Sequence, residues 1–276
     1  MEYSKPGLSQ RPGSSAAAWI SRALLLALLF TASAAAHAAT VVPLNDTGQT
    51  LCYPPGTGGA VSCATVADDG HYGRDAANTA GVLTKTGAGN AGFDFSKIAN
   101  NGTTLGAGAA LGTAATDWAC TKDNVTGLTW EVKTTSGLRS STHTYTWYST
   151  DAATNGGNAG SLGTDTCGGT LSAYSNQCNT ANYVAAVNAT ALCGYSDWRL
   201  PSLRELQSLV DFSVSASPYI DTTYFPNTQI NWYGTANTVS QTPTQLWSVT
   251  FYNTFTNPTF KAQAALGYFR LVRGVQ

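Results

Sequence analysis

The densest structural signal in this 276-residue chain is residues 193–210, which read Cys-Gly-Tyr-Ser-Asp-Trp-Arg-Leu-Pro-Ser-Leu-Arg-Glu-Leu-Gln-Ser-Leu-Val. Ser202 and Glu205 have the spacing of a capping box, in which each side chain accepts a hydrogen bond from the backbone N–H of the other residue. Pro201, just before the cap, favours an extended residue ahead of it. Apolar residues then recur at helical spacing on one face: Leu203, Leu206, Leu209 and Val210. The segment therefore predicts an extended turn followed by a short amphipathic helix.

Residues 117–276 carry most of the other signals of secondary structure. Asp, Asn and Gly in residues 123–130 predict a turn that leads into a strand, with Leu128 and Trp130 on one face. Thr180 is suited to cap a second helix that runs to about Leu192. Further strands are predicted at residues 144–148, 230–236, 246–252 and 268–274, and a long Gly/Ser/Thr/Asn loop at 150–172. Two helices and a strand-rich remainder predict an α+β domain with antiparallel sheet.

The predicted strand at 246–252 has the clearest pattern. Trp247, Val249 and Phe251 alternate with Ser248 and Thr250. Such alternation is typical of a strand with one buried and one exposed face, so the three large residues are expected to point into the core.

The first 116 residues differ in character from this domain. Residues 1–38 combine early basic residues, a short apolar run and a closing Ala-His-Ala, which is typical of a secretory signal peptide cut after Ala38. Residues 39–116 form a Gly/Ala/Thr-rich, loop-rich N-terminal extension, and the low-complexity tract at 101–116 is expected to be loop or linker. The organisation is therefore a signal peptide, an extension and a domain at 117–276.

Two segments of the extension stand out from this background. Residues 92–95, Gly-Phe-Asp-Phe, predict a strand. Residues 68–75 are locally charged, but their spacing does not match an Asp-x-Asp-x-Asp-Gly calcium loop, so they predict a solvated turn.

Charge is sparse and nearly balanced. Residues 1–38 contain three of the 14 basic and one of the 15 acidic residues, which leaves 11 basic and 14 acidic residues and a net charge of −3. No run of Lys or Arg is present, so nucleic acid is not an expected partner. No segment after the predicted cleavage site is long and apolar enough for a transmembrane helix. We expect an exported protein that is periplasmic, cell-surface or secreted.

Six cysteines follow the predicted cleavage site, and in an exported chain they are expected to form three disulfides. Many pairings are possible. Cys52–Cys63 and Cys167–Cys178 would close short loops, and Cys120–Cys193 would join the first strand of the domain to the Trp-Arg-Leu-Pro turn. A zinc site is not expected, because Cys-x-x-Cys pairs are missing.

Four blocks in residues 117–276 follow one another in a specific order. They are Asp123-Asn124-x-Thr126-Gly127-Leu128-x-Trp130-Glu131, Asp197-Trp198-Arg199-Leu200-Pro201, Asp221-x-x-Tyr224-Phe225-Pro226-Asn227 and Arg270-Leu271-Val272-Arg273. Together they resemble the Lcl C-terminal domain family, secreted bacterial modules of unknown function. The resemblance implies a C-type-lectin-like fold. This chain has Trp-Tyr-Gly-Thr at 232–235, where the family usually has Tyr-Trp-Ser-Ser, and this departure falls on a surface where binding is expected.

Enzymatic activity is not expected. The formylglycine-generating enzymes, whose fold the family resembles, need a reactive cysteine pair late in the domain, and no cysteine follows Cys193. The chain has no Gly-x-Ser-x-Gly, and only His71 and His143 remain as bases after residue 38. The carboxylates that remain for glycoside chemistry are Glu131, Glu205, Asp197 and Asp221. Of these, Glu205 is assigned to capping and Asp197 to a turn.

The function that the sequence favours is non-catalytic recognition of carbohydrate or of another surface ligand, such as a surface protein. The candidate ligand-binding residues are Arg204, Arg273, Trp232 and Tyr233. Trp198, Arg199 and Arg270 are expected to support the fold instead. Sugar-binding C-type lectins have Glu-Pro-Asn where this chain has Phe-Pro-Asn at 225–227, so no calcium or other cofactor is predicted. The alternative is a structural or assembly component of the cell surface or a pilus, with oligomerisation.

Overall fold

A computed structural model describes residues 45–52, 59, 61, 69–262 and 267–274. These residues belong to one compact unit, which spans residues 42–276. The predicted signal peptide and Cys63, the predicted partner of Cys52, lie outside the described residues.

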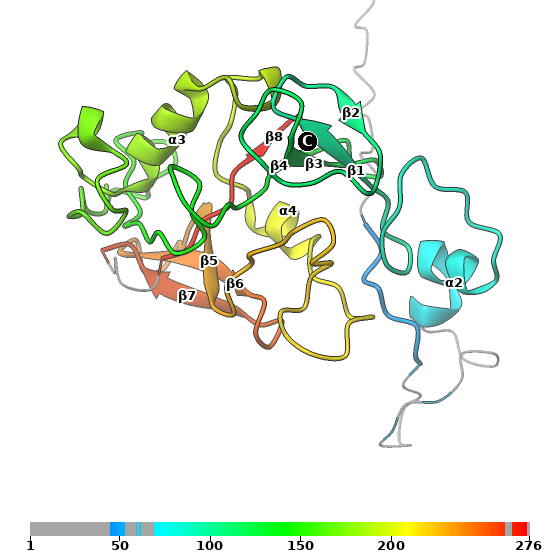
Figure 1. The fold of residues 1–276 in the computed structure, drawn as a ribbon. Helices are drawn as coiled ribbons and strands as arrows, with labels where there is room; N and C mark the ends of the chain where they lie inside the picture. Colours follow the sequence, from blue (N-terminus) through cyan, green and yellow to red (C-terminus); the bar gives the residue numbers. More distant parts are fainter. Residues whose placement is uncertain (1–44, 53–58, 60, 62–68, 263–266, 275–276) are drawn as a thin grey trace, which may run out of the picture. The chain divides into compact units, whose positions relative to one another are not determined.

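The described chain contains two antiparallel sheets, as Figure 1 shows. The first has the strand order β2-β1-β3-β4-β8 and the second the order β5-β6-β7. The first sheet is formed by β1 (Phe95–Ala99), β2 (Thr104–Leu105), β3 (Trp118–Asp123), β4 (Thr129–Glu131) and β8 (Val272–Arg273). The second is formed by β5 (Trp232–Thr238), β6 (Gln245–Thr250) and β7 (Thr256–Phe260). The α+β class with antiparallel sheets is therefore confirmed.

The C-terminal segment links the two sheets. Tyr268 forms a bridge with Tyr233 of β5, and Val272 in β8 pairs with Trp130 of β4 and forms a bridge with Arg199. A few residues therefore pass from one sheet to the other, which places the Trp-Arg-Leu-Pro turn against the end of the chain.

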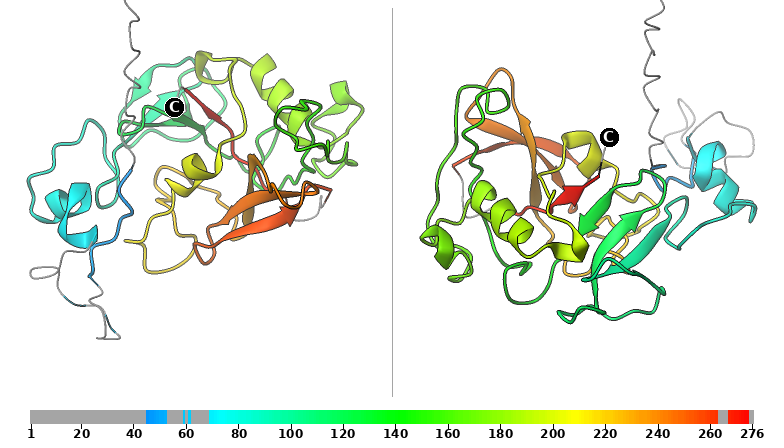
Figure 2. Two further views of the ribbon diagram at one scale, coloured as in Figure 1. Left: turned by 180° about the vertical axis from the view of Figure 1, so that it is seen from behind. Right: turned by 90° about the horizontal axis from the view of Figure 1, so that it is seen from above.

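Three α-helices complete the described fold: α2 (Gly73–Thr79), α3 (Thr180–Ala189) and α4 (Leu203–Gln207). The capping box is confirmed, since the Glu205 N–H donates to Ser202 Oγ at 3.3 Å and the Ser202 N–H donates to Glu205 Oε2 at 2.6 Å. The cap of α3 is Asn179 rather than Thr180, because the Asn179 side chain accepts from the Asn182 N–H. Figures 1 and 2 show α4 between the two sheets.

Two apolar clusters fill the interior. One includes Leu206, Leu209, Trp130, Tyr233 and Val249 and packs α4 against both sheets. The other is built around α3 and the disulfides Cys120–Cys193 and Cys167–Cys178, and it includes Trp198. Trp198 is 2% exposed, so its predicted place in the core is confirmed.

The first sheet begins before residue 117, where the domain was predicted to start. β1 pairs along its length with β3, and β2 pairs with β1 from inside the low-complexity tract. The tract was expected to be loop or linker, but it returns the chain antiparallel to β1 through a turn at Gly102, whose φ is +86°. Composition alone misses this, because sheet pairing depends on the backbone.

Residues 68–75 were predicted to be a turn, but the described part of this segment contains a 3-10 turn at Asp69–His71 and the start of α2. Asp75 is fully buried and accepts hydrogen bonds from the Gly48 N–H at 2.8 Å and the Gly92 N–H at 2.6 Å. Asp46 in turn accepts from the Asp75 N–H at 2.9 Å. These bonds fasten the extension to itself around one carboxylate.

Other strand predictions were only partly right. Residues 144–148 form isolated bridges at Thr146 and Tyr148 instead of a strand. β7 was missed, because Asn and Pro at 257–258 give it low strand propensity. In β6 the simple alternation is wrong: Ser248 is buried and bonds Asn257 O at 2.8 Å, whereas Trp247 is half-buried.

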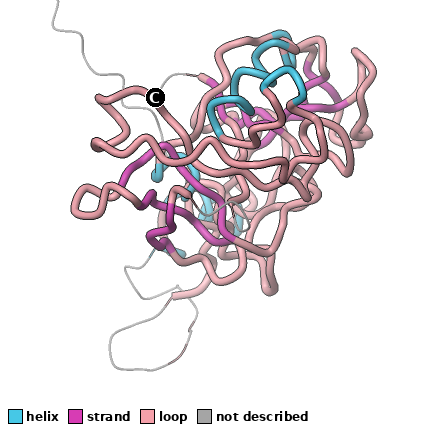
Figure 3. The backbone as a smooth tube through the Cα atoms, turned by 90° about the vertical axis from the view of Figure 1, so that its left-hand side faces the viewer, coloured by secondary structure: helices cyan, strands magenta, loops and turns pink. Residues whose placement is uncertain are grey.

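Loops make up much of the described chain, as Figure 3 shows. Two disulfides fasten them, and both were predicted: Cys120–Cys193 and Cys167–Cys178. The first joins β3 to the 3-10 turn Leu192–Gly194 just before the Trp-Arg-Leu-Pro turn. None of the helices in the described ranges is long and apolar enough to cross a membrane.

Candidate functional site

The Trp-Arg-Leu-Pro turn is held by an ion pair that supports α4. Arg199 donates to both carboxylate oxygens of Glu205, at 2.8 and 2.6 Å, and also to Gly274 O. Burial alone would raise the pKa of Glu205, but the bonds from Arg199 and Ser202 hold it below its usual value. Arg199 therefore anchors the fold, as predicted, and α4 begins at a fixed place over β5 and β6.

An open cavity of about 360 Å³ lies at the start of α4, where the helix meets the second sheet. It is lined by Ser202, Leu203, Arg204, Asn237, Thr238 and Trp247. We call these six residues the Trp247 hollow. The helix supplies two of the residues and its N-cap Ser202 a third, and the strands β5 and β6 supply the other three.

Apart from Leu203, the residues that line the hollow with Trp247 have polar side chains. Asn237 Oδ1 accepts from the Leu203 N–H at 2.7 Å, which leaves its amide N–H₂ group available as a donor. Arg204 is exposed and forms no ion pair with any described residue. A half-buried aromatic face with amide and guanidinium donors beside it can stack against a ring and bind its polar groups.

Two of the predicted ligand residues, Trp232 and Tyr233, lie away from the Trp247 hollow, the first because of strand register and the second because it is buried. Trp232 lies opposite Thr250, and Tyr233 lies opposite Val249. Because side chains alternate across a strand, Trp232 points to the face of the sheet opposite Trp247. Tyr233 is 1% exposed in the core, and its hydroxyl accepts from the Gln229 N–H.

Arg273, the other predicted arginine, is already paired. It donates to both carboxylate oxygens of Asp197, at 2.8 and 3.1 Å. Its guanidinium carbon lies 3.7 Å from the centre of the Tyr195 ring. The four predicted ligand residues therefore do not form one site. Of the four, only Arg204 lines the Trp247 hollow.

The sequence did not single out Trp247 or Asn237 as binding residues. Trp247 was assigned to the core face of its strand, because the alternation cannot show where α4 stops covering that face. The signal that was available is Arg204 in the first turn of a capped helix, since its side chain is on the polar side of the helix.

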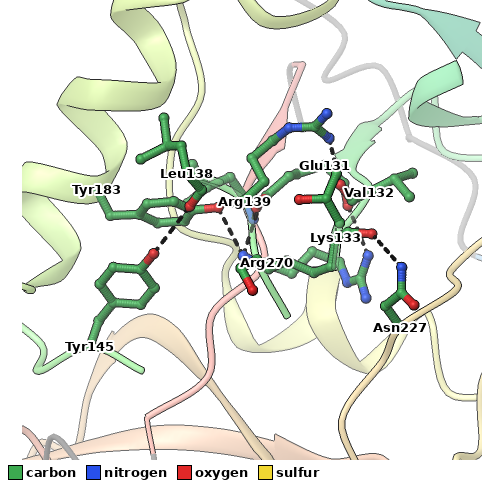
Figure 4. Close-up of polar contacts among 12 residues, drawn as sticks. Glu131, Val132, Lys133, Leu138, Arg139, Tyr145, Tyr183, Asn227 and Arg270 are labelled. Carbon is green, nitrogen blue, oxygen red and sulfur yellow. Dashed lines mark hydrogen bonds and ion pairs between the residues drawn. The ribbon is translucent and has the colours of Figure 1, made fainter. Parts of the chain in front are cut away.

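A second group of polar residues lies inside the protein and is drawn in Figure 4. The Glu131 carboxylate is fully buried, 3.0 Å from Lys133 Nζ and 2.9 Å from the Leu271 N–H, and it also accepts from the Tyr183 hydroxyl. Lys133 Nζ donates to the Tyr183 hydroxyl at 2.8 Å. Arg270 donates to Glu131 O at 2.8 Å, which confirms its predicted role as an anchor. We call Glu131, Lys133, Tyr183 and Arg270 the Glu131 network.

Burial and mutual pairing set the charges of the Glu131 network. Burial would raise the pKa of Glu131, but Lys133 and the hydrogen bonds hold it below its usual value. Burial lowers the pKa of Lys133 to about 8, and Glu131 opposes that shift. Burial and the Glu131 charge raise the pKa of Tyr183 well above its usual value, so this hydroxyl is neutral. The network is an internal clasp between β4, α3 and the C-terminal segment.

Two polar residues of the third family block, Asp221 and Asn227, form hydrogen bonds within the protein. Asp221 is 4% exposed and accepts from the Asn90 and Thr223 N–H groups. Asn227 donates to Lys133 O at 3.0 Å. Among the described residues one acid–cysteine cluster has metal-like spacing, Asp165, Cys167 and Cys178, but its two cysteines form a disulfide. Asp221 and Asn227 therefore help to hold the fold, and the two cysteines of the Asp165 cluster are not free thiolates.

A wider recess of about 470 Å³ lies between the low-complexity tract, residues 134–139 and the end of α3. Its walls are mostly Asn, Thr and small residues, with Arg139 at one side. Arg139 donates to Val132 O at 2.5 Å and to Ala119 O at 3.0 Å, so its guanidinium is bonded to the backbone of two segments of the first sheet region. Unlike the Trp247 hollow, this recess has no aromatic side chain among its described lining residues.

Comparison with protein families assigns the chain to a family. The family model of the Lcl C-terminal domain matches residues 119–273. The chain belongs to this family, as its four sequence blocks predicted. Searches of curated proteins and of solved structures each found no match. The match includes the Glu131 network and the Trp247 hollow and leaves β1 and β2 outside.

Proposed function

We propose that this protein is a non-catalytic, exported recognition module that binds carbohydrate in the Trp247 hollow. The observation that carries the proposal is the indole of Trp247 beside two polar side chains, Arg204 and Asn237, in an open cavity. Sugar rings have apolar C–H faces and a rim of hydroxyl groups, so an aromatic face with donors around it is complementary to them.

The absence of acids from the lining of the hollow supports a non-catalytic role. None of its six lining residues is Asp or Glu. Glycoside hydrolysis by the usual route needs two carboxylates on either side of the bond. The nearest acid along α4, Glu205, is buried against Arg199. Binding without turnover is therefore the chemistry that the side chains favour.

The proposal extends to the fold relationship and to location. A C-type-lectin-like arrangement fits an α+β chain with long loops, and two disulfides fit an oxidising compartment such as the periplasm or the exterior of the cell. A structural or assembly role at the cell surface is the second candidate, and the exposed aromatic residues Tyr252 and Phe255 in the turn after β6 favour it.

A glycan array with the disulfide-bonded protein tests the proposal, with calcium and with a chelator. We expect saturable binding to at least one glycan that persists without calcium. A blank array from folded protein would contradict carbohydrate binding and favour assembly, which would then show as concentration-dependent oligomers.

Matched variants locate the site. We expect W247A and R204A each to weaken binding by about tenfold or more, equivalent to about 1.4 kcal/mol. R273A is the control, because Arg273 is paired with Asp197 and lies outside the hollow. Equal losses in R204A and R273A would remove the hollow as the site.

A further inference from the structure

We infer that Lys261 is a positioning residue for the Trp247 hollow. Its ammonium group binds backbone carbonyls of the loop at residues 151–158, and this loop contacts Thr238, which lines one side of the hollow. The inference rests on the proposed function, since it concerns the same hollow. In this inference, the ammonium group of a lysine orders a loop by binding its carbonyl oxygens, as a bound metal cation does in many loop-rich sites.

Lys261 directly follows β7 and is 1% exposed. Its Nζ donates to Asn155 O and to Asn158 O, each at 2.8 Å. It also lies 4.1 Å from the centre of the Trp147 ring. No carboxylate among the described residues forms an ion pair with it.

A buried ammonium without a carboxylate is costly unless other groups replace its water. Here two carbonyl oxygens and the face of an indole do so, since carbonyl dipoles and the ring quadrupole both attract a cation. Backbone carbonyls that converge on one positive charge are also the way in which loops bind hard cations. The ammonium of Lys261 is therefore the centre around which the loop is arranged.

The loop has turns of its own, and Lys261 is one of its connections to the second sheet. Within it, the Asn155 N–H donates to Asp151 O at 3.0 Å and the Gly157 N–H donates to Asn155 Oδ1 at 2.8 Å. Most of residues 151–158 are exposed, so apolar packing holds little of it. Long Gly/Asn-rich loops of this kind have little intrinsic order.

The same loop contacts the hollow through Thr238. Thr238 Oγ1 donates to Thr154 O at 3.1 Å. Gly156 packs so closely that an added Cβ would lie 2.9 Å from Thr238 Cγ2. Thr238 lines the hollow and adjoins Asn237, so a shift of the loop would move the wall that carries the amide.

The first test uses the full protein without ligand. K261M removes the ammonium and keeps an apolar stem, and we expect amide exchange to rise at least tenfold at residues 154–158 and at 237–238. K85M is the matched control, because Lys85 Nζ also donates to two loop carbonyls, Gly89 O at 2.7 Å and Ala91 O at 2.6 Å. We expect K85M to leave residues 154–158 and 237–238 unchanged.

The second test uses a glycan that the array retains. We expect K261M to weaken binding by about tenfold, a chelator to leave binding unchanged, and T238V to weaken binding in a way that is not additive with K261M. T238V also tests the inference if K261M does not fold, because it removes the hydrogen bond between Thr238 and the loop. In that case, unchanged affinity in T238V overturns the inference.

Three outcomes overturn the inference, and one bears on the proposed function alone. Unchanged exchange at 237–238 in K261M, unchanged affinity despite a loosened loop, or loss of binding with a chelator each contradicts a positioning role for Lys261. If the wild-type protein retains no glycan, the proposed function fails, and the exchange at 237–238 still decides whether Lys261 holds this wall.

Discussion

The Glu131 network and the Trp247 hollow each contain an arginine and an aromatic residue, but the polar groups of the two regions are used in opposite ways. In the network, Glu131, Lys133 and Arg270 are at most 3% exposed, and each bonds another part of the chain. In the hollow, Arg204 is exposed and unpaired among the described residues, and Asn237 uses its oxygen but keeps its N–H₂ group available. The difference shows that charge alone does not mark a site. In our proposal, the binding site is marked by donors that have no partner among the described residues.

The largest expected effect tests whether the network is a structural clasp. E131Q leaves Lys133 as a buried charge without a carboxylate, so the free energy of unfolding should fall by about 3–5 kcal/mol. Urea denaturation with an unchanged m-value measures it. The double variant E131Q/K133M should recover part of the loss, because it removes the unpaired charge. A loss below about 1 kcal/mol in E131Q would mean that the Glu131 network contributes little to the stability of the fold.

The next prediction uses pH to separate the network from the extension. Because the folded pKa of Glu131 is lowered, its contribution to stability is present above its ordinary titration range near pH 4 and is lost as pH falls through the lower folded value. Asp75 has the opposite sign: burial, and then the Asp46 charge, raise the pKa of Asp75 to about 6. Its folded state binds the proton more tightly, so the contribution of Asp75 is lost as pH rises through about 6.

Acidification from pH 7 to about 5 should therefore stabilise the part of the extension that is bonded to Asp75 and leave the network unchanged. The measurement is the protection factor of the Gly48 and Gly92 amides, which both donate to Asp75. D75N is the control, because it removes the titrating group, and its protection should lose this pH dependence. Protection that falls on acidification in the wild-type protein would reverse the assigned sign.

The smallest effect concerns the stability of the hollow. R204A should change the free energy of unfolding by no more than about 0.5 kcal/mol, since an exposed side chain without partners contributes little. The same denaturation series as for E131Q measures it. A loss well above about 1 kcal/mol would show that Arg204 supports the fold, and the contrast between the two regions would then be wrong.

The features that the sequence predicted correctly are those with a local or covalent cause. Ser202 and Glu205 specify their helix by spacing alone, and Cys120–Cys193 was predicted as the pair that would join the first strand of the domain to the Trp-Arg-Leu-Pro turn. β7 and the pairing of β1 with β3 were missed or incomplete, because they depend on partners distant in sequence. Trp247 was assigned to the core for the same reason, since the short length of α4 leaves it half-covered.

The early start of the first sheet has a practical consequence for anyone who isolates the family region. A fragment that begins at residue 117 would lack β1, so the backbone of β3 would become a bare edge strand, open to pairing with other molecules and to aggregation. It would also lose Asn45, which donates to Asp123 and to Ser208 O and so fastens the turn before β4 to the end of α4. The segment before residue 117 thus covers the edge of β3 and protects it from pairing with other molecules. A fragment that keeps residues 45–116 should stay monomeric under conditions in which the shorter fragment precipitates.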